Sequence, residues 1–126
     1  MRLLLDTHAV LWLLAGDERL RPALPILAQA ESVHVSAASW WELAIKISLG
    51  RLHYSLADIR AGAAASGLLE LPVTGPHSEA LLRLPAHHKD PFDRILIWQA
   101  IKNNFTLISN DVNMSPYRME GLKLLW

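Results

Sequence analysis

Three consecutive leucines near the start of the chain, Leu3, Leu4 and Leu5, constrain its fold more than any other feature. No polar residue interrupts the run, and Asp6 ends it. A strand with one face in water would alternate apolar and polar residues, so this run predicts a strand covered on both faces, as in a parallel α/β sheet. Because open parallel sheets bind ligands where their strands end, Asp6 is expected at the ligand-binding edge.

Length and composition restrict the class of protein. The 126 residues are enough for one domain with its own core, and we expect residues 1–126 to form it. Lysine plus arginine number 12 and aspartate plus glutamate number 12, so no overall basic field attracts nucleic acid. The absence of cysteine excludes disulfides and thiolate chemistry. No apolar segment has the length of a membrane span or a signal-peptide core, so we expect a cytoplasmic protein without membrane contact.

Apolar periodicity and turn residues predict alternating strands and helices. After the first strand, the predicted strands cover residues 33–36, 68–73, 105–109 and 122–125. The predicted helices cover residues 7–15, 17–30, 39–49, 55–67, 76–84 and 91–103. This order predicts a single three-layer α/β/α domain around a central, mostly parallel sheet of about five strands.

Four acidic residues attract attention, and each has a structural explanation as a helix cap or a first-turn residue. The four are Asp6, Glu42, Asp93 and Asp111. Glu42 can close a capping box that begins at Ser39, or can pair with Lys46 one turn later. Lys46 can either neutralise Glu42 in this way or contact phosphate.

Considered together, the same four acids predict a metal site. Asp6 and Asp111 follow predicted strands, Glu42 lies in the first turn of a helix that follows a strand, and the loop after the helix of Asp93 sets its position. Carboxylates that converge on one sheet edge repel each other unless a cation neutralises them. Oxygen ligands without cysteine or paired histidine suit Mg²⁺ or Mn²⁺.

Five motifs in this order resemble the PIN-domain family, and in particular its VapC-type toxins from bacterial type II toxin–antitoxin pairs. The motifs are L-L-L-D-T-H at residues 3–8, S-x-W-E-L-A-I-K at 39–46, L-G-R-L at 49–52, H-K-D-P-F-D-R at 88–94 and T-L-I-S-N-D at 106–111. Together they cover nearly the whole chain, and their ordered set is specific although no single motif is decisive.

The resemblance implies a Mg²⁺- or Mn²⁺-dependent endoribonuclease on a PIN-like fold, which hydrolyses RNA with a water molecule activated by the metal. It assigns the acidic cluster to the same four acids, as catalytic and metal-binding residues, and gives Ser109 a supporting role through hydrogen bonding. It also implies a homodimer and a cognate antitoxin that inserts a segment into or beside the active site. Contact with DNA is expected only indirectly, through that antitoxin.

Several side chains beside these motifs have two explanations each. Asp90 is best explained as the cap of the helix at residues 91–103, with contact to a second metal as the alternative. Arg94 either contacts phosphate or pairs with an acid, and the pairing is favoured. Thr7 either binds a metal-bound water or serves as a helix-start hydroxyl, and the second is favoured. For His87 and His88, a solvated loop is favoured over contact with RNA.

The helix predicted at residues 39–49 is apolar nearly all round. Trp41, Ile45 and Leu49 share one face, while Trp40, Leu43 and Ile47 share another. One face can enter the core, and the other needs a partner, for which we consider a second copy or an antitoxin, or else a thick helical layer.

Two other classes of function remain open at this point. One is a PIN-like nuclease that processes RNA or acts on DNA without a toxin role. The other is a non-catalytic binding module whose acids are only caps, although a complete acidic set argues against it.

Overall fold

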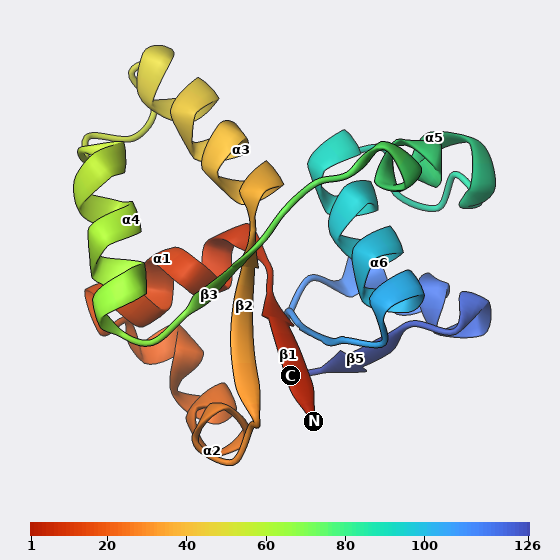
Figure 1. The fold of residues 1–126 in the computed structure, drawn as a ribbon, viewed down its shortest axis with the longest axis horizontal. Helices are drawn as coiled ribbons and strands as arrows, with labels where there is room; N and C mark the ends of the chain where they lie inside the picture. The colour runs from red at the N-terminus through yellow and green to blue at the C-terminus, as the bar shows by residue number, and fades with distance from the viewer.

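The computed structural model describes the backbone of residues 1–126 and every side chain except that of residue 81. A five-stranded sheet lies at its centre, in the order β3-β2-β1-β4-β5, and all neighbouring strands are parallel. The strands are β1 (Arg2–Leu5), β2 (Ser32–Ser36), β3 (Leu69–Leu71), β4 (Thr106–Ile108) and β5 (Lys123–Leu125). Helices lie on both sides of this sheet (Figure 1), which confirms the predicted three-layer α/β fold.

The helical segments fill the connections between the strands. The α-helices are α1 (Thr7–Ala15), α2 (Leu24–Ala28), α3 (Ala37–Ser48), α4 (Leu56–Ala65), α5 (Ala80–Arg83) and α6 (Pro91–Asn103). Three 3₁₀ segments accompany them: η1 (Glu18–Ala23), η2 (Gly75–Glu79) and η3 (Val112–Glu120). None of the helices in the described chain is long and apolar enough to cross a bilayer.

The leucine run forms β1, the middle strand of the sheet. Leu4 faces a core formed with α6 and η3, while Leu3 and Leu5 face a second core formed with α1 and η1. All three side chains are fully buried. Burying one leucine contributes roughly 1.5–3 kcal/mol. Because its leucines enter both cores, this short strand holds the two layers of the fold together.

Two predicted helices are each divided in the structure. The segment predicted as one helix over residues 17–30 consists of η1 followed by α2. Pro22 lies inside η1 and cannot donate a backbone hydrogen bond, so the regular helix begins only after it. The predicted helix over residues 76–84 is likewise divided into η2 and α5.

The start of α3 differs from the prediction. Ser36, the last residue of β2, caps the helix, and its Oγ accepts a hydrogen bond from the Ala38 N–H at 3.1 Å. Ser39 lies inside the helix, so the capping box predicted for Ser39 and Glu42 is wrong. Glu42 consequently lies in the second turn of α3, so helix capping does not explain why an acid is placed there.

Candidate functional site

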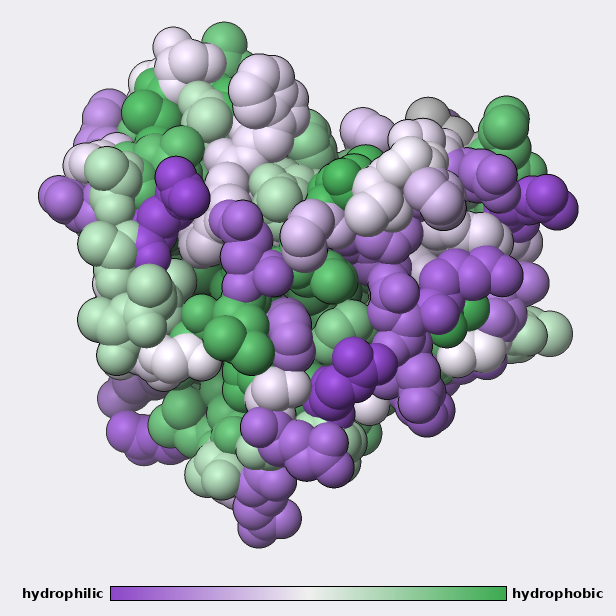
Figure 2. Space-filling model, viewed as in Figure 1, coloured by the Kyte–Doolittle hydropathy of each residue, from purple (hydrophilic) through white to green (hydrophobic). Residues whose placement is uncertain are grey.

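The carboxyl edge of the sheet is the region where the predicted acids meet. Asp6 follows β1 directly, and its N–H donates to the Ile108 carbonyl at 3.1 Å, which continues the pairing with β4. Its Oδ1 accepts a hydrogen bond from the Ala9 N–H at 2.7 Å and so caps α1. The start of α3 and the start of α6 lie near this edge (Figure 1). Figure 2 shows the surface indented between the α3–α4 side and the α5–α6 side.

Asp6 is almost completely buried, and this burial raises the pKa of its carboxyl group. Hydrogen bonds from Ser109 and from the Ala9 N–H act in the opposite direction, whereas the charge of Asp111 raises the pKa further. Ser109 Oγ also accepts a hydrogen bond from the Asp111 N–H at 3.1 Å. Ser109 therefore links the acid that follows β1 to the acid that follows β4.

Glu42 brings a third carboxylate to this edge from α3. Only 8% of the residue is exposed, and its Oε2 lies 3.4 Å from Lys46 Nζ. This ion pair confirms the predicted pairing with Lys46. The second oxygen, Oε1, is buried and has no hydrogen-bond partner among the described residues. An unpaired buried carboxylate oxygen is costly, so this atom marks a place for a further ligand.

Asp93 lies in the first turn of α6, and its pKa is raised to about 7. Desolvation by burial is the largest cause, and the negative charges of Asp90, Glu42 and Asp6 add to it, while His88 opposes them. These charges act on Asp93 because they are close to it. The structure therefore brings together acids from α3, α6 and the end of β1.

His88 also belongs to this cluster, which the sequence did not predict. Its Nε2 lies 2.9 Å from Asp93 Oδ2 and 3.5 Å from Asp111 Oδ2, and only 13% of its side chain is exposed. The expectation of a solvated loop is therefore wrong for His88, although His87 is exposed as predicted. His88, Asp93 and Asp111 each offer one ligand atom within 4.8 Å of the others, so together they could hold a metal ion.

Tyr117 from η3 and Arg94 from α6 hold the loop of His88 in place. The Tyr117 hydroxyl accepts a hydrogen bond from the His88 N–H at 2.9 Å and donates one to the Pro85 carbonyl at 2.7 Å. The buried Arg94 guanidinium donates to the carbonyls of His88 at 3.2 Å and Leu84 at 3.0 Å. Arg94 thus holds the backbone of this loop in place with its buried guanidinium, and the phosphate contact and the acid pair stay predictions.

Thr7 and Asp90 take the structural roles that the sequence favoured. Thr7 Oγ1 donates a hydrogen bond to Ser39 Oγ at 2.9 Å, which joins the start of α1 to α3. Asp90 Oδ1 accepts from the Phe92 N–H at 2.8 Å and from the Asp93 N–H at 3.3 Å, and so caps α6. Its charge nevertheless acts on Asp93, so the cap also contributes to the electrostatics of the site.

The model of one family, the PIN domain, matches residues 3–118. The chain belongs to the PIN-domain family. Curated protein sequences give no match. The fold of this PIN domain is also that of several solved structures, of which three illustrate the likeness.

The first is the VapBC2 complex from Rickettsia felis bound to a promoter DNA fragment, with a TM-score of 0.71, 16% identity, and 99% of this chain and 98% of the other covered. A toxin–antitoxin complex from Klebsiella pneumoniae has a TM-score of 0.59, 20% identity, and 86% and 85% covered. FitAcB from Neisseria gonorrhoeae has a TM-score of 0.61, 16% identity, and 98% and 96% covered. At such identities the likeness is one of fold.

The donor set of this PIN domain fits a divalent cation. Carboxylate oxygens are the ligands that Mg²⁺ and Mn²⁺ prefer, and Asp93 and Asp111 offer two of them beside His88, with ligand atoms within 4.8 Å of one another. Glu42 Oε1 is buried without a partner among the described residues, and burial together with neighbouring carboxylates disfavours the ionised form of Asp93. A bound cation would provide the missing partner for both.

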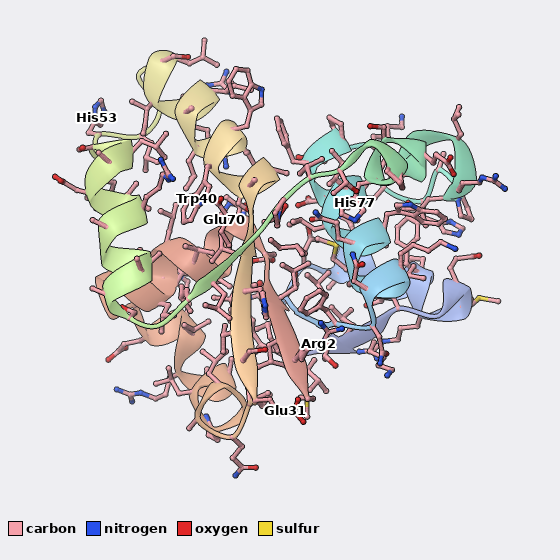
Figure 3. The ribbon with its side chains drawn as sticks, in the orientation of Figure 1. Arg2, Glu31, Trp40, His53, Glu70 and His77 are labelled. Atoms are coloured by element: carbon pink, nitrogen blue, oxygen red, sulfur yellow. The ribbon has the colours of Figure 1, made fainter. Side chains whose placement is uncertain are left out.

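One face of α3 in this PIN domain is uncovered by the rest of the chain. The exposed fractions are 67% for Trp41, 60% for Leu49 and 36% for Ile45. On another face, Trp40 Nε1 donates a hydrogen bond to Glu70 Oε1 at 2.8 Å (Figure 3). The predicted division of α3 into a covered and an uncovered apolar face is confirmed.

Proposed function

We propose that this PIN domain is a divalent-metal-dependent endoribonuclease and the toxin component of a bacterial type II toxin–antitoxin pair. The observation that carries the proposal is the gathering of carboxylates at one sheet edge, in which Glu42 Oε1 has no partner among the described residues. The raised pKa of Asp93, at about 7, supports the same conclusion, because burial and, after it, the negative charges of Asp90, Glu42 and Asp6 disfavour the ionised carboxyl group.

In this proposal Asp6, Glu42, Asp93 and Asp111 hold Mg²⁺ or Mn²⁺. The bound cation would supply the Lewis acidity that activates water and stabilises negative charge on the scissile phosphate. Ser109 links the carboxylate of Asp6 to the backbone of Asp111 through its two hydrogen bonds. Hydrolysis by water leaves a 3′-hydroxyl and a 5′-phosphate on the RNA products.

Lys46 and Asp90 support this arrangement at its border. Lys46 holds one oxygen of Glu42, which leaves the other oxygen directed to the cation. Asp90 fixes the start of α6 and thereby the position of Asp93, without a need to bind metal itself. Asp6 is placed in the same way by its own cap on α1.

The toxin role rests on a different set of observations. The three structural relatives include toxin–antitoxin complexes, and one of them is bound to promoter DNA. The uncovered face of α3 gives this chain an apolar surface for a partner, as a homodimer or with an antitoxin. Since the net charge is zero, we propose that DNA contact comes only through the antitoxin.

Cleavage of a mixed cellular RNA pool tests the proposal. The purified chain, free of antitoxin, is incubated with RNA in Mg²⁺, in Mn²⁺ and in chelator, next to the Asp6→Asn and Asp93→Asn variants. We expect discrete products only from the wild type and only with metal. Equal products from the variants would reveal a contaminating nuclease and remove the support for this site.

A parallel incubation with single-stranded DNA separates the substrate classes. Cleavage of RNA alone is expected from the proposed function. Metal-dependent cleavage of DNA instead would indicate a DNA-directed PIN nuclease. A folded wild type that binds metal and cleaves neither would contradict the nuclease assignment for the substrates tested.

A further inference from the structure

The imidazole of His88 lies where a ligand of the proposed cation would lie. Its Nε2 is 2.9 Å from Asp93 Oδ2 and 3.5 Å from Asp111 Oδ2. Two ligand atoms that are neighbours on one octahedral ion, each about 2.1 Å from it, lie about 3 Å apart. The two distances from Nε2 are close to this spacing, and all three ligand atoms lie within 4.8 Å of one another.

The direction of the contact distinguishes a shared ion from a simple hydrogen bond. Nε2 of His88 is buried and makes no hydrogen bond of acceptable geometry within the described chain, although Asp93 Oδ2 is close enough for one. The ring therefore has the distance of a hydrogen bond to this oxygen without its direction. This geometry is expected when ring nitrogen and carboxylate oxygen are aimed at a common third point.

The loop around His88 is fixed before any ligand binds. The Tyr117 hydroxyl holds its N–H at 2.9 Å, and the Arg94 guanidinium holds its carbonyl at 3.2 Å. The opposite ring nitrogen, Nδ1, has only a long contact of 3.4 Å from the Asp90 N–H. Nδ1 accepts in this contact, so a metal on Nε2 requires the ring proton to lie on Nδ1 and the long hydrogen bond from Asp90 to be given up, which at 3.4 Å is a weak one.

We propose that His88 is a metal ligand, and that Nε2 of His88 with carboxylate oxygens of Asp93 and Asp111 forms a mixed nitrogen–oxygen site that favours Mn²⁺ over Mg²⁺. The inference rests on the proposed function, because it adds a ligand to the cation of that site. Glu42 Oε1, buried, unpartnered and close enough to raise the pKa of Asp93, is the independent sign that this cluster lacks a ligand. An imidazole nitrogen strengthens binding of Mn²⁺ more than binding of Mg²⁺, which prefers oxygen ligands alone.

Electron spin-echo spectroscopy of the Mn²⁺-loaded chain tests this inference without any measurement of activity. A nitrogen bound to Mn²⁺ modulates the echo, and labelling histidine with ¹⁵N changes the modulation from the ¹⁴N to the ¹⁵N pattern. We expect this change in the wild type and in His53→Gln, a control at an exposed position on the α3–α4 side (Figure 3). We expect no histidine modulation in His88→Gln.

Affinity provides a second readout on the same proteins. His88→Gln is expected to bind Mn²⁺ at least about tenfold more weakly than the wild type, with a smaller change for Mg²⁺. Equal losses for both ions would show that His88 only positions Asp93, and this would overturn the ligand assignment.

The wild type alone is sufficient to refute the inference, so the test does not depend on the folding of a variant. Mn²⁺ that binds without histidine modulation would overturn the role of His88 and leave the carboxylate site and the proposed function standing. A wild type that binds no Mn²⁺ would overturn both together.

Discussion

The two edges of the sheet differ in how their charged groups are paired and exposed to water. At the amino edge, the α-amino group of Met1 lies 3.7 Å from Glu31, and Lys123 Nζ donates to Asn104 Oδ1 at 2.8 Å. The side chains of the Met1–Glu31 pair are more than half exposed, so water screens what the partners do not neutralise. The charges at this edge need no ligand from outside the chain.

At the carboxyl edge, carboxylates outnumber the cationic groups that face them, and several are buried. The acids there are Asp6, Glu42, Asp93 and Asp111. Lys46 and His88 lie within 4 Å of them. Because burial without full pairing destabilises a fold, the comparison teaches that the carboxyl edge is arranged for binding at some cost in stability.

The same substitution at the two edges gives the largest expected contrast. Glu42→Gln keeps the size of the side chain but removes a proposed metal ligand, so we expect metal-dependent RNA cleavage to fall on the order of 100-fold or more. Glu31→Gln at the amino edge should leave the rate unchanged. Initial rates at saturating Mn²⁺ measure both, and equal rates for the two variants would remove the functional difference between the edges.

Asp93→Asn should change stability with opposite signs in the absence and presence of metal. The folded pKa of Asp93 is about 7 against an ordinary value of 3.8, so the folded state keeps a proton that the unfolded state loses. The wild type therefore loses stability as the pH rises from about 4 to about 7. In chelator at pH 8 we expect the variant to be more stable by on the order of 2 kcal/mol.

The wild type and Asp93→Asn should have equal free energies of unfolding in chelator at about pH 3, where Asp93 is protonated in both the folded and the unfolded state. In excess Mn²⁺ the order should reverse at pH 8, because only the wild type gains full binding energy. Urea unfolding at the two pH values, with and without metal, measures these differences. A wild type more stable than the variant in chelator at pH 8 would contradict the raised pKa of Asp93.

Tyr117→Phe should weaken the support of the carboxyl edge by a smaller amount. The hydroxyl makes hydrogen bonds to the His88 N–H and the Pro85 carbonyl, and their loss should cost about 1–2 kcal/mol of stability. Hydrogen exchange at residue 88 should accelerate as well. Tyr54→Phe is the matched control, since Tyr54 is 62% exposed, and it should change neither quantity.

The smallest expected effect is that of Glu31→Gln on stability. The ion pair with the α-amino group of Met1 is exposed on both sides, so its loss should change the free energy of unfolding by less than about 0.5 kcal/mol. Thermal unfolding at low salt measures this change. A loss above about 1 kcal/mol would show that the amino edge also depends on a specific charge pair.

Much of the fold is predictable because its strongest signals are local. The leucine run gave a buried central strand, and Gly16 ended α1 in the left-handed conformation that favours glycine. Local signals fail where two neighbouring residues offer the same chemistry. Ser36 and Ser39 can both cap a helix, and the end of β2 at Ser36 decides between them.

The candidate site is predictable to the extent that strand ends fix it. Asp6 and Asp111 follow β1 and β4, which are neighbours in the sheet, so their approach follows from the topology. His88 was missed because its position depends on Tyr117, which is 29 residues later in the chain. The backbone contacts of Arg94 are hidden from the sequence for a similar reason, since the carbonyls that it binds belong to a loop folded back on α6.

Calorimetric titration of Mn²⁺ into the chelator-treated chain tests the central claim most directly, because that claim concerns a cation at the carboxyl edge. The wild type should show saturable heat of binding, and the Asp6→Asn/Glu42→Gln double variant should show none while remaining folded by circular dichroism. Glu31→Gln should bind like the wild type. Equal binding by the wild type and the double variant, or no binding by either, would contradict the account.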